Sequence, residues 1–204
     1  MAFRKIGLGN VPLSYFNSKN MVFADKTKYI QKLEELGSSA VVFLRPRRFG
    51  KTLFTNILKS YYDKKRFAQF DENFSGTWIH SHRTPLAGSF CCLRLDFSRV
   101  QSLPERISQG FIEAVIAGLI DFTVSYPEIG LPPDKLTPDL YNSPVSLLLA
   151  FINNFKLKAG PETRLFIIID EYDHFANDVL SSDRDAFREL TSTAAGHTGL
   201  IKNF

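Results

Sequence analysis

The sequence predicts an α/β domain in which a parallel β-sheet is flanked by helices in three layers. Three observations lead to this prediction. Short apolar runs alternate with stretches of helical periodicity, the apolar runs lack polar alternation, and glycines or prolines separate the two kinds of segment. Strands that are buried on both faces of a parallel sheet have this unbroken apolar character, so we expect helices on both faces.

The first helix is expected over residues 26–36, and the first strand directly after it. The apolar side chains of the helix recur at helical spacing: Tyr29, Ile30, Leu33 and Leu36. Gly37 is the expected stop signal. Residues 40–44 (AVVFL) form a short apolar run with two β-branched residues, which predicts a strand buried inside the sheet.

The remaining elements follow the same alternation. We expect helices over residues 51–62, 104–124, 143–158 and 185–195, and strands over residues 90–97 and 165–169. Pro104 suits the first turn of a helix, and the strand at 165–169 is the most apolar of the chain. Strand, helix and strand in this order predict parallel pairing through crossover connections.

Composition limits the class of protein. The chain has 204 residues, of which 44% are hydrophobic and 23% charged, so we expect one domain, spanning residues 1–204, and exclude disorder as its main state. Its 25 Lys and Arg residues exceed its 21 Asp and Glu residues, and the net charge of +4 permits an anionic partner without requiring one.

Cys91 and Cys92 are the two cysteines of the chain, and they are adjacent. Neighbouring strand residues face opposite sides of a sheet, so we expect no disulfide between them. Residues 1–16 lack the continuous apolar stretch of a signal peptide, and the chain has no apolar run of about 18 residues. We therefore expect a cytoplasmic protein that does not span a membrane.

Residues 45–52 (RPRRFGKT) stand where the expected strand 40–44 leads into a helix. A helix start offers backbone N–H groups to a phosphate, a glycine lets the backbone approach it, Lys51 can reach the terminal phosphates, and the Thr52 hydroxyl can ligate Mg²⁺. The full phosphate-binding pattern is GxxxxGK[ST]. Here Arg45 stands at the first glycine position, whereas Gly50, Lys51 and Thr52 are intact, so GKT alone leaves open a simple basic loop.

Asp170 and Glu171 follow the apolar strand at 165–169. A carboxylate at the end of such a strand can hold Mg²⁺, and the next one can polarise an attacking water. The alternative is a strand end capped by charges. Because ligands of parallel sheets bind beyond the carboxyl ends of the strands, the two motifs together favour a nucleotide site.

Four strings in the sequence resemble those of a known family. FADKTKYI, FLRPRRFGKT, LRLDFS and LFIIIDEYDH occur in the order typical of the predicted AAA-ATPase-like family, and the resemblance covers about residues 23–178. It implies a P-loop NTPase core of the additional-strand class. In the family itself, arginine is usual at the position of Arg45. It also implies that Lys51 and Thr52 bind triphosphate and magnesium, that Asp170 holds magnesium, and that Glu171 is the catalytic base.

The expected cofactors are therefore ATP and Mg²⁺, with Glu171 and Lys51 as catalytic candidates and Thr52 and Asp170 as metal ligands. The candidate nucleotide-binding residues are Arg47, Arg48, Phe49, Gly50, Lys51, Thr52 and Leu53. Because members of this family commonly continue for several hundred residues, we expect an N-terminal portion of the fold that is incomplete at its C-terminus, with slow or no hydrolysis. We also expect a gap one strand wide between strands 40–44 and 165–169, roughly 9 to 10 Å between their axes.

Several weaker features leave alternatives open. Asp96 could face the same site or simply cap its strand by bonding the Ser98 backbone, and we favour the site. Asp25 or Thr27 in the segment 25–27 (DKT) could be a helix N-cap, whereas the family resemblance implies that this segment lies close to the nucleotide. We assign no zinc to His80 and His82, and no base to His174.

A second function is also consistent with the sequence. The basic residues Arg45, Arg47, Arg48 and Lys51, together with the run at 64–66, could instead contact a nucleic acid or a protein partner. In that case the chain would be a degenerate interaction module.

Overall fold

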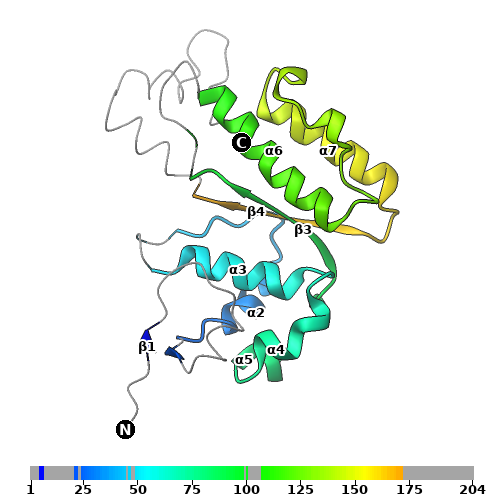
Figure 1. Ribbon diagram of the computed structural model, residues 1–204. Helices are drawn as coiled ribbons and strands as arrows, with labels where there is room; N and C mark the ends of the chain where they lie inside the picture. Colours follow the sequence, from blue (N-terminus) through cyan, green and yellow to red (C-terminus); the bar gives the residue numbers. More distant parts are fainter. Residues whose placement is uncertain are drawn as a thin grey trace. The chain divides into compact units, whose positions relative to one another are not determined.

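The computed structural model describes residues 5–6, 21–22, 24–44, 46, 49–98, 100 and 107–171. Its helices are α2 Lys28–Glu35, α3 Lys51–Tyr62, α4 Phe70–Phe74, α5 Trp78–Ser81, α6 Ile107–Ser125 and α7 Pro144–Lys158 (Figure 1). Its strands are β1 Lys5–Ile6, β2 Met21–Val22, β3 Phe90–Asp96 and β4 Arg164–Asp170. Short 3-10 helices occur at Phe67–Gln69, Pro133–Lys135 and Pro138–Leu140. The described part of the chain is therefore of mixed α/β class.

The chain divides into two compact units. The first unit comprises Met1–Cys92 with Arg164–Phe166, and the second comprises Leu93–Thr163 with Ile167–Phe204. β3 pairs with β4, and both strands begin in the first unit and continue in the second. The separate pair β1 and β2 is parallel and belongs to the first unit.

β3 and β4 run in the same direction. The Phe90 ring at the start of β3 lies 5.7 Å from the Phe166 ring near the start of β4. At the other end, the backbone N–H of Phe97 donates to the carbonyl of Asp170 at 3.1 Å. Parallel strands need a crossover connection, and α6 and α7 lie between β3 and β4 in the sequence. This agrees with the parallel pairing that the sequence predicts.

α3 buries one stripe of apolar residues in the first unit. The buried apolar side chains of the helix include Phe54, Ile57, Leu58 and Tyr61. Their spacing of three and four residues places them on one face of the helix. The edge of the Tyr61 ring meets the Phe74 ring of α4, with centroids 5.7 Å apart. Packing of this stripe fixes the helix that the sequence predicts over residues 51–62.

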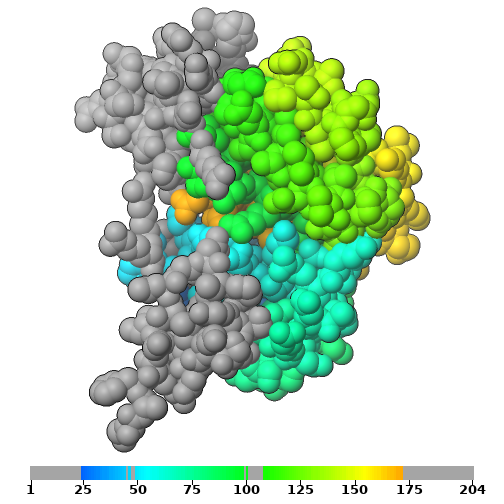
Figure 2. All heavy atoms as spheres, viewed as in Figure 1, coloured from blue at the N-terminus to red at the C-terminus, as the bar shows by residue number. Residues whose placement is uncertain are grey.

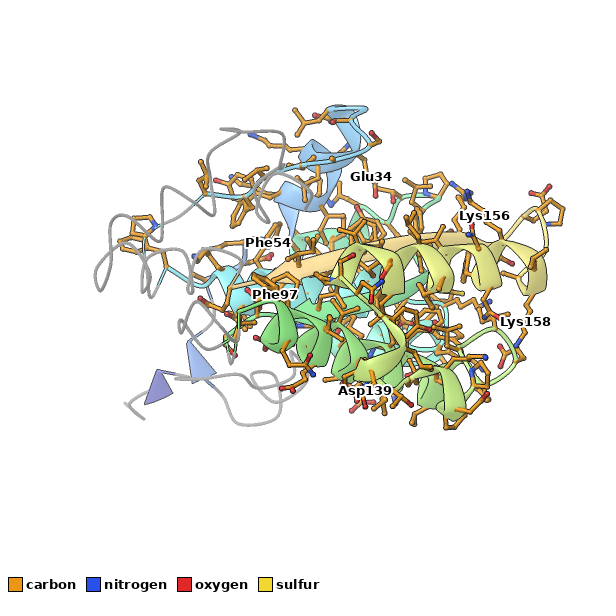
Figure 3. The ribbon with its side chains drawn as sticks, turned by 90° about the horizontal axis from the view of Figure 1, so that it is seen from above. Glu34, Phe54, Phe97, Asp139, Lys156 and Lys158 are labelled. Atoms are coloured by element: carbon orange, nitrogen blue, oxygen red, sulfur yellow. The ribbon has the colours of Figure 1, made fainter. Side chains whose placement is uncertain are left out.

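Glu34 of α2, which is labelled in Figure 3, connects distant parts of the first unit through the hydrogen bonds of its carboxylate. The hydroxyl groups of Tyr62 and Thr84 donate to its Oε1 atom at 3.0 and 2.9 Å. The Thr84 hydroxyl also lies 3.0 Å from the Tyr61 hydroxyl. Burial and the neighbouring Glu34 charge raise the pKa of Tyr62 above its ordinary value, so Tyr62 stays a hydrogen-bond donor to Glu34.

The second unit is built on α6 and α7, which lie side by side in Figure 1 and form a continuous surface in Figure 2. The Phe122 ring of α6 meets the Phe151 ring of α7 edge to face, with centroids 5.0 Å apart. Gly118 lets α6 approach β3, because a Cβ atom there would lie 2.6 Å from the carbonyl oxygen of Arg94. Ser143 caps α7 through a reciprocal pair of hydrogen bonds with Ser146.

The expected strand over residues 40–44 is wrong. These residues have no strand in the structure, and the side chains of Val42 and Leu44 are 71% and 76% exposed. An apolar run is compatible with a strand, but a strand also needs a neighbour that pairs with its N–H and C=O groups. Residues 40–44 have no such ladder in the described part of the chain. The expected gap between this segment and the strand at 165–169 stays a prediction.

The other elements that fall on described residues are confirmed, with boundaries shifted by a few residues. α2, α3, α6, α7, β3 and β4 correspond to expected elements. The start of the expected helix at 104–124 and the whole helix at 185–195 lie outside the described residues.

Candidate functional site

Gly50 begins α3 in a left-handed backbone conformation, with φ of 77° and ψ of 32°. Glycine adopts this conformation at little steric cost. Gly50 is the N-cap residue, and it makes no side-chain hydrogen bond to the first turn of the helix. Because the N-cap residue has no side chain of its own to bond the first turn of α3, its N–H groups suit a helix start that receives an anion.

Lys51, Thr52 and Leu53 form the first turn of α3, and all three are half-buried. The Thr52 carbonyl accepts a hydrogen bond from the Thr55 hydroxyl at 2.9 Å, a local contact of the first turn. The helix thus presents a lysine and a threonine directly after its glycine N-cap, as the motif requires.

Phe49 precedes the glycine and is 58% exposed. Its backbone N–H donates to the carbonyl of Pro46 at 3.3 Å, which tightens the loop before α3. The sequence-predicted residues Arg45, Arg47 and Arg48 lie outside the described residues.

Asp25 and Thr27 hold the segment before α2 against the start of α5. Asp25 accepts hydrogen bonds from the backbone N–H groups of Thr27 at 2.8 Å and Trp78 at 2.6 Å. The hydroxyl of Thr27, which is fully buried, accepts from the backbone N–H of Ile79 at 3.1 Å. Thr27 is the N-cap residue of α2 and makes no side-chain capping bond to it, and Asp25 bonds the N–H of Thr27 rather than the first turn. The N-cap alternative is therefore not confirmed, and the Thr27 side chain binds α5 instead.

Asp170 ends β4 and is only 4% exposed. Its Oδ2 atom accepts a hydrogen bond from Nη2 of Arg94 at 2.9 Å, and its Oδ1 atom accepts from the backbone N–H of Glu171 at 3.1 Å. A buried carboxylate is costly unless a cation and hydrogen bonds compensate its charge. Arg94 supplies that compensation within the second unit.

Arg94 was not predicted from the sequence as a residue of this site. The sequence does contain an indication of its role, because Arg94 interrupts the apolar strand at 90–97 and a buried charged residue requires a partner. Arg94 and Asp96 are also two residues apart and so share a face of β3, where their side chains approach to 3.8 Å. The spacing alone did not identify Asp170, which is far away in the sequence.

Glu171 has a positive φ of 55°, and in the described part of the chain no other non-glycine residue has one. This conformation costs a side-chain-bearing residue about 1 to 2 kcal/mol. Strain of this kind persists where the surrounding structure imposes it, and it is often found at functional sites. Glu171 is half-buried.

The two halves of the predicted site belong to different units. Gly50, Lys51 and Thr52 lie in the first unit, and Asp170 and Glu171 lie in the second. Each half has its own local geometry, and a nucleotide site that both halves form together stays a prediction.

The weaker candidates have structural partners. The Asp96 carboxylate accepts a hydrogen bond from the backbone N–H of Ser98 at 3.0 Å, which is the strand-end contact given as the alternative to a site role. Nε2 of His80 lies 3.0 Å from Asp71, and the His82 ring stacks on Trp78 with centroids 4.0 Å apart. His174 lies outside the described residues.

Among the described residues there is neither a candidate metal cluster nor a membrane-spanning helix. They contain no group of three or more His, Cys, Asp or Glu side chains that could hold a metal ion. None of the helices found in them is long and apolar enough to cross a membrane.

A helix that starts at a left-handed glycine followed by Lys and Thr is typical of nucleotide-binding α/β proteins. A buried aspartate at the end of a strand is a second such feature. Comparison with family models gives the family: residues 9–204 match the model described as predicted AAA-ATPase, and the chain belongs to this family. Family membership indicates nucleotide binding. Neither the search of curated proteins nor the search of solved structures found a match.

Proposed function

We propose that the chain binds Mg-ATP as a P-loop domain, with Gly50, Lys51 and Thr52 at the phosphates and Asp170 and Glu171 beside the metal ion and the attacking water. The observation that carries this proposal is the left-handed Gly50 at the start of α3, followed directly by Lys51 and Thr52. Membership of the predicted AAA-ATPase family supports it.

The donors at the start of α3 have the chemistry that a triphosphate needs. Backbone N–H groups, an ammonium group and a hydroxyl group are all hydrogen-bond donors to phosphate oxygens. In the proposed arrangement, Arg47, Arg48, Phe49 and Leu53 complete the nucleotide-binding segment around them. Three-layer organisation of the domain, with residues 1–204 as one P-loop unit, belongs to the same proposal.

The residues that would hold magnesium are Thr52 and Asp170. Oδ2 of Asp170 accepts from Arg94 and Oδ1 accepts from the backbone N–H of Glu171. Carboxylate and hydroxyl oxygens are the kind of ligand that magnesium prefers. When bound, magnesium would neutralise charge on the phosphates. The oxygen atoms of Thr52 and Asp170 would therefore be suitable ligands for magnesium.

Glu171 would accept the proton of the attacking water, since its carboxylate follows the strand end and the buried Asp170 directly. The constrained backbone at φ of 55° would hold this carboxylate in one orientation.

Titration calorimetry with Mg-ATP tests the proposal. The wild-type chain should bind, and Lys51→Ala should weaken binding at least about tenfold, since a charge-assisted contact to phosphate contributes about 1.5 to 3 kcal/mol. Lys158→Ala is the matched control, because this exposed residue of the last turn of α7 carries the same charge (Figure 3). Absence of binding by the folded wild-type chain at millimolar nucleotide would overturn the proposal.

A basic run favours a second candidate function, the binding of nucleic acid. Lys64, Lys65 and Arg66 are consecutive and all exposed directly after α3. Binding of this kind would weaken steeply with salt, and neither Lys51→Ala nor ATP would change it. Fluorescence anisotropy with labelled DNA and RNA would detect it.

A further inference from the structure

Lys26 lies against the loop that precedes α3. Its Nζ atom donates a hydrogen bond to the carbonyl oxygen of Phe49 at 3.1 Å. The same atom lies 3.5 Å from the position that a Cβ atom on Gly50 would occupy. All three residues belong to the first unit. A positive charge from the segment before α2 is therefore placed beside the N-cap of the helix that carries Lys51.

The neighbours of Lys26 keep its backbone in place. Asp25 and Thr27 bind the backbone N–H groups of Trp78 and Ile79, which lie 53 and 52 residues away in the sequence. The carbonyl of Lys26 itself accepts a hydrogen bond from the N–H of Tyr29 at 3.0 Å. Because the flanking residues are fixed in this way, ligand binding would cost little backbone conformational entropy at Lys26.

The amine of Lys26 keeps donor capacity for a ligand. An ammonium group has three N–H donors, and the contact to Phe49 uses one of them. The acceptor at Phe49 is a neutral carbonyl, and in the described ranges no ion pair joins Lys26 to a carboxylate. Lys26 is half-buried, so solvent screens its charge less than that of a fully exposed lysine.

We propose that Lys26 is a second phosphate-binding lysine, which contacts phosphate oxygens of the bound nucleoside triphosphate together with Lys51. This inference rests on the proposed function, because it assigns a further residue to the same site. The recognised group is the phosphate chain, and the contribution of Lys26 is its charge. Asp25 and Thr27 are positioning residues that fix the backbone on either side of it.

The test compares four substitutions by calorimetric titration with Mg-ATP. Lys26→Met removes the charge and should weaken binding about tenfold, whereas Lys26→Arg should keep most of the affinity. Lys26→Gln keeps a donor for the Phe49 carbonyl without the charge, and it should be as weak as Lys26→Met. Lys28→Met is the matched control, since Lys28 is exposed and only two residues away, and it should bind as the wild type does.

The outcomes separate this inference from the proposed function. If Lys26→Gln binds as tightly as the wild type, the lysine only supports the loop, and the inference is overturned. The same holds if Lys26→Met binds normally while Lys51→Ala does not. If the wild type itself does not bind Mg-ATP, the proposed function is overturned, and this inference is overturned with it. Lower salt should strengthen binding by the wild type more than binding by folded Lys26→Gln, and equal salt dependence would contradict a charge contribution.

Discussion

Arg94 and Asp170 form an ion pair between β3 and β4, with Nη2 and Oδ2 2.9 Å apart. The aspartate is 4% exposed and the arginine side chain 20% exposed, so the pair is largely shielded from water. The same aspartate is the proposed metal-binding carboxylate. The cation that stabilises the folded strand end is thus in contact with the group that would approach Mg²⁺.

Substitution Arg94→Met should lower the free energy of unfolding by about 2 to 3 kcal/mol, since it leaves a buried carboxylate without its cation. The double variant Arg94→Met with Asp170→Asn should lose less than the sum of the two single losses, because the second change removes the unpaired charge. Urea unfolding measures both. Lys156→Met, at an exposed position of α7, should change stability by less than about 0.5 kcal/mol. Additive losses would show that the pair is not coupled.

The second prediction compares two glycines that share a φ of 77°, Gly50 and Gly76. Valine at either position should cost about 1 to 2 kcal/mol of stability, because a side chain disfavours this conformation. Gly50→Val alone should also abolish Mg-ATP binding, since the added side chain would occupy the proposed phosphate-binding loop. A Cβ atom on Gly76 would meet no atom within 4 Å, so Gly76→Val should bind normally. Equal affinity of both variants would contradict a phosphate-binding role for the loop.

The third prediction concerns the constrained Glu171. Glu171→Gln should keep Mg-ATP affinity and stability but remove hydrolysis, because an amide cannot accept the proton of the attacking water. Glu171→Gly should also remove hydrolysis, and it should raise the free energy of unfolding by about 0.5 to 1 kcal/mol, since relief of the left-handed strain exceeds the entropic cost of glycine. Phosphate release and urea unfolding are the measurements. Unchanged turnover in Glu171→Gln would remove this residue from the mechanism.

The fourth prediction concerns the adjacent thiols of Cys91 and Cys92, which are 0% and 2% exposed. Burial, and next the charge of Asp63, raise the pKa of Cys92 above its ordinary value, so its reactive thiolate is scarce even at mildly alkaline pH. Iodoacetamide should therefore modify neither cysteine in the folded chain and both after unfolding in urea. Mass spectrometry measures the number of adducts, and rapid modification of the folded chain would show that β3 opens readily.

The elements that the sequence predicted correctly are those whose signals are local. In α3 the glycine N-cap and the stripe ending at Tyr61 lie within twelve residues of one another. Residues 40–44 gave an equally clear apolar signal, but a strand depends on a partner elsewhere in the chain, which a local pattern does not reveal. The run is exposed for that reason.

In the candidate site, too, the sequence predicted local features but not long-range contacts. Gly50, Lys51, Thr52 and Asp170 were selected from their motifs, and their local conformations agree with those motifs. The contacts of Arg94 with Asp170 and of Lys26 with Phe49 join residues 76 and 23 positions apart. Such contacts follow from the tertiary fold, so neither the spacing nor the composition of the sequence predicted them.

The attachment of α5 to Asp25 and Thr27 has a consequence for local opening of the chain. α5 has only four residues, and its own N-cap, Thr77, makes no side-chain hydrogen bond to it. The first two N–H groups of this helix are instead held by side chains from the segment before α2. Whenever that segment detaches, these N–H groups lose their acceptors, so hydrogen exchange at Trp78 and Ile79 should report how often Lys26 leaves its loop.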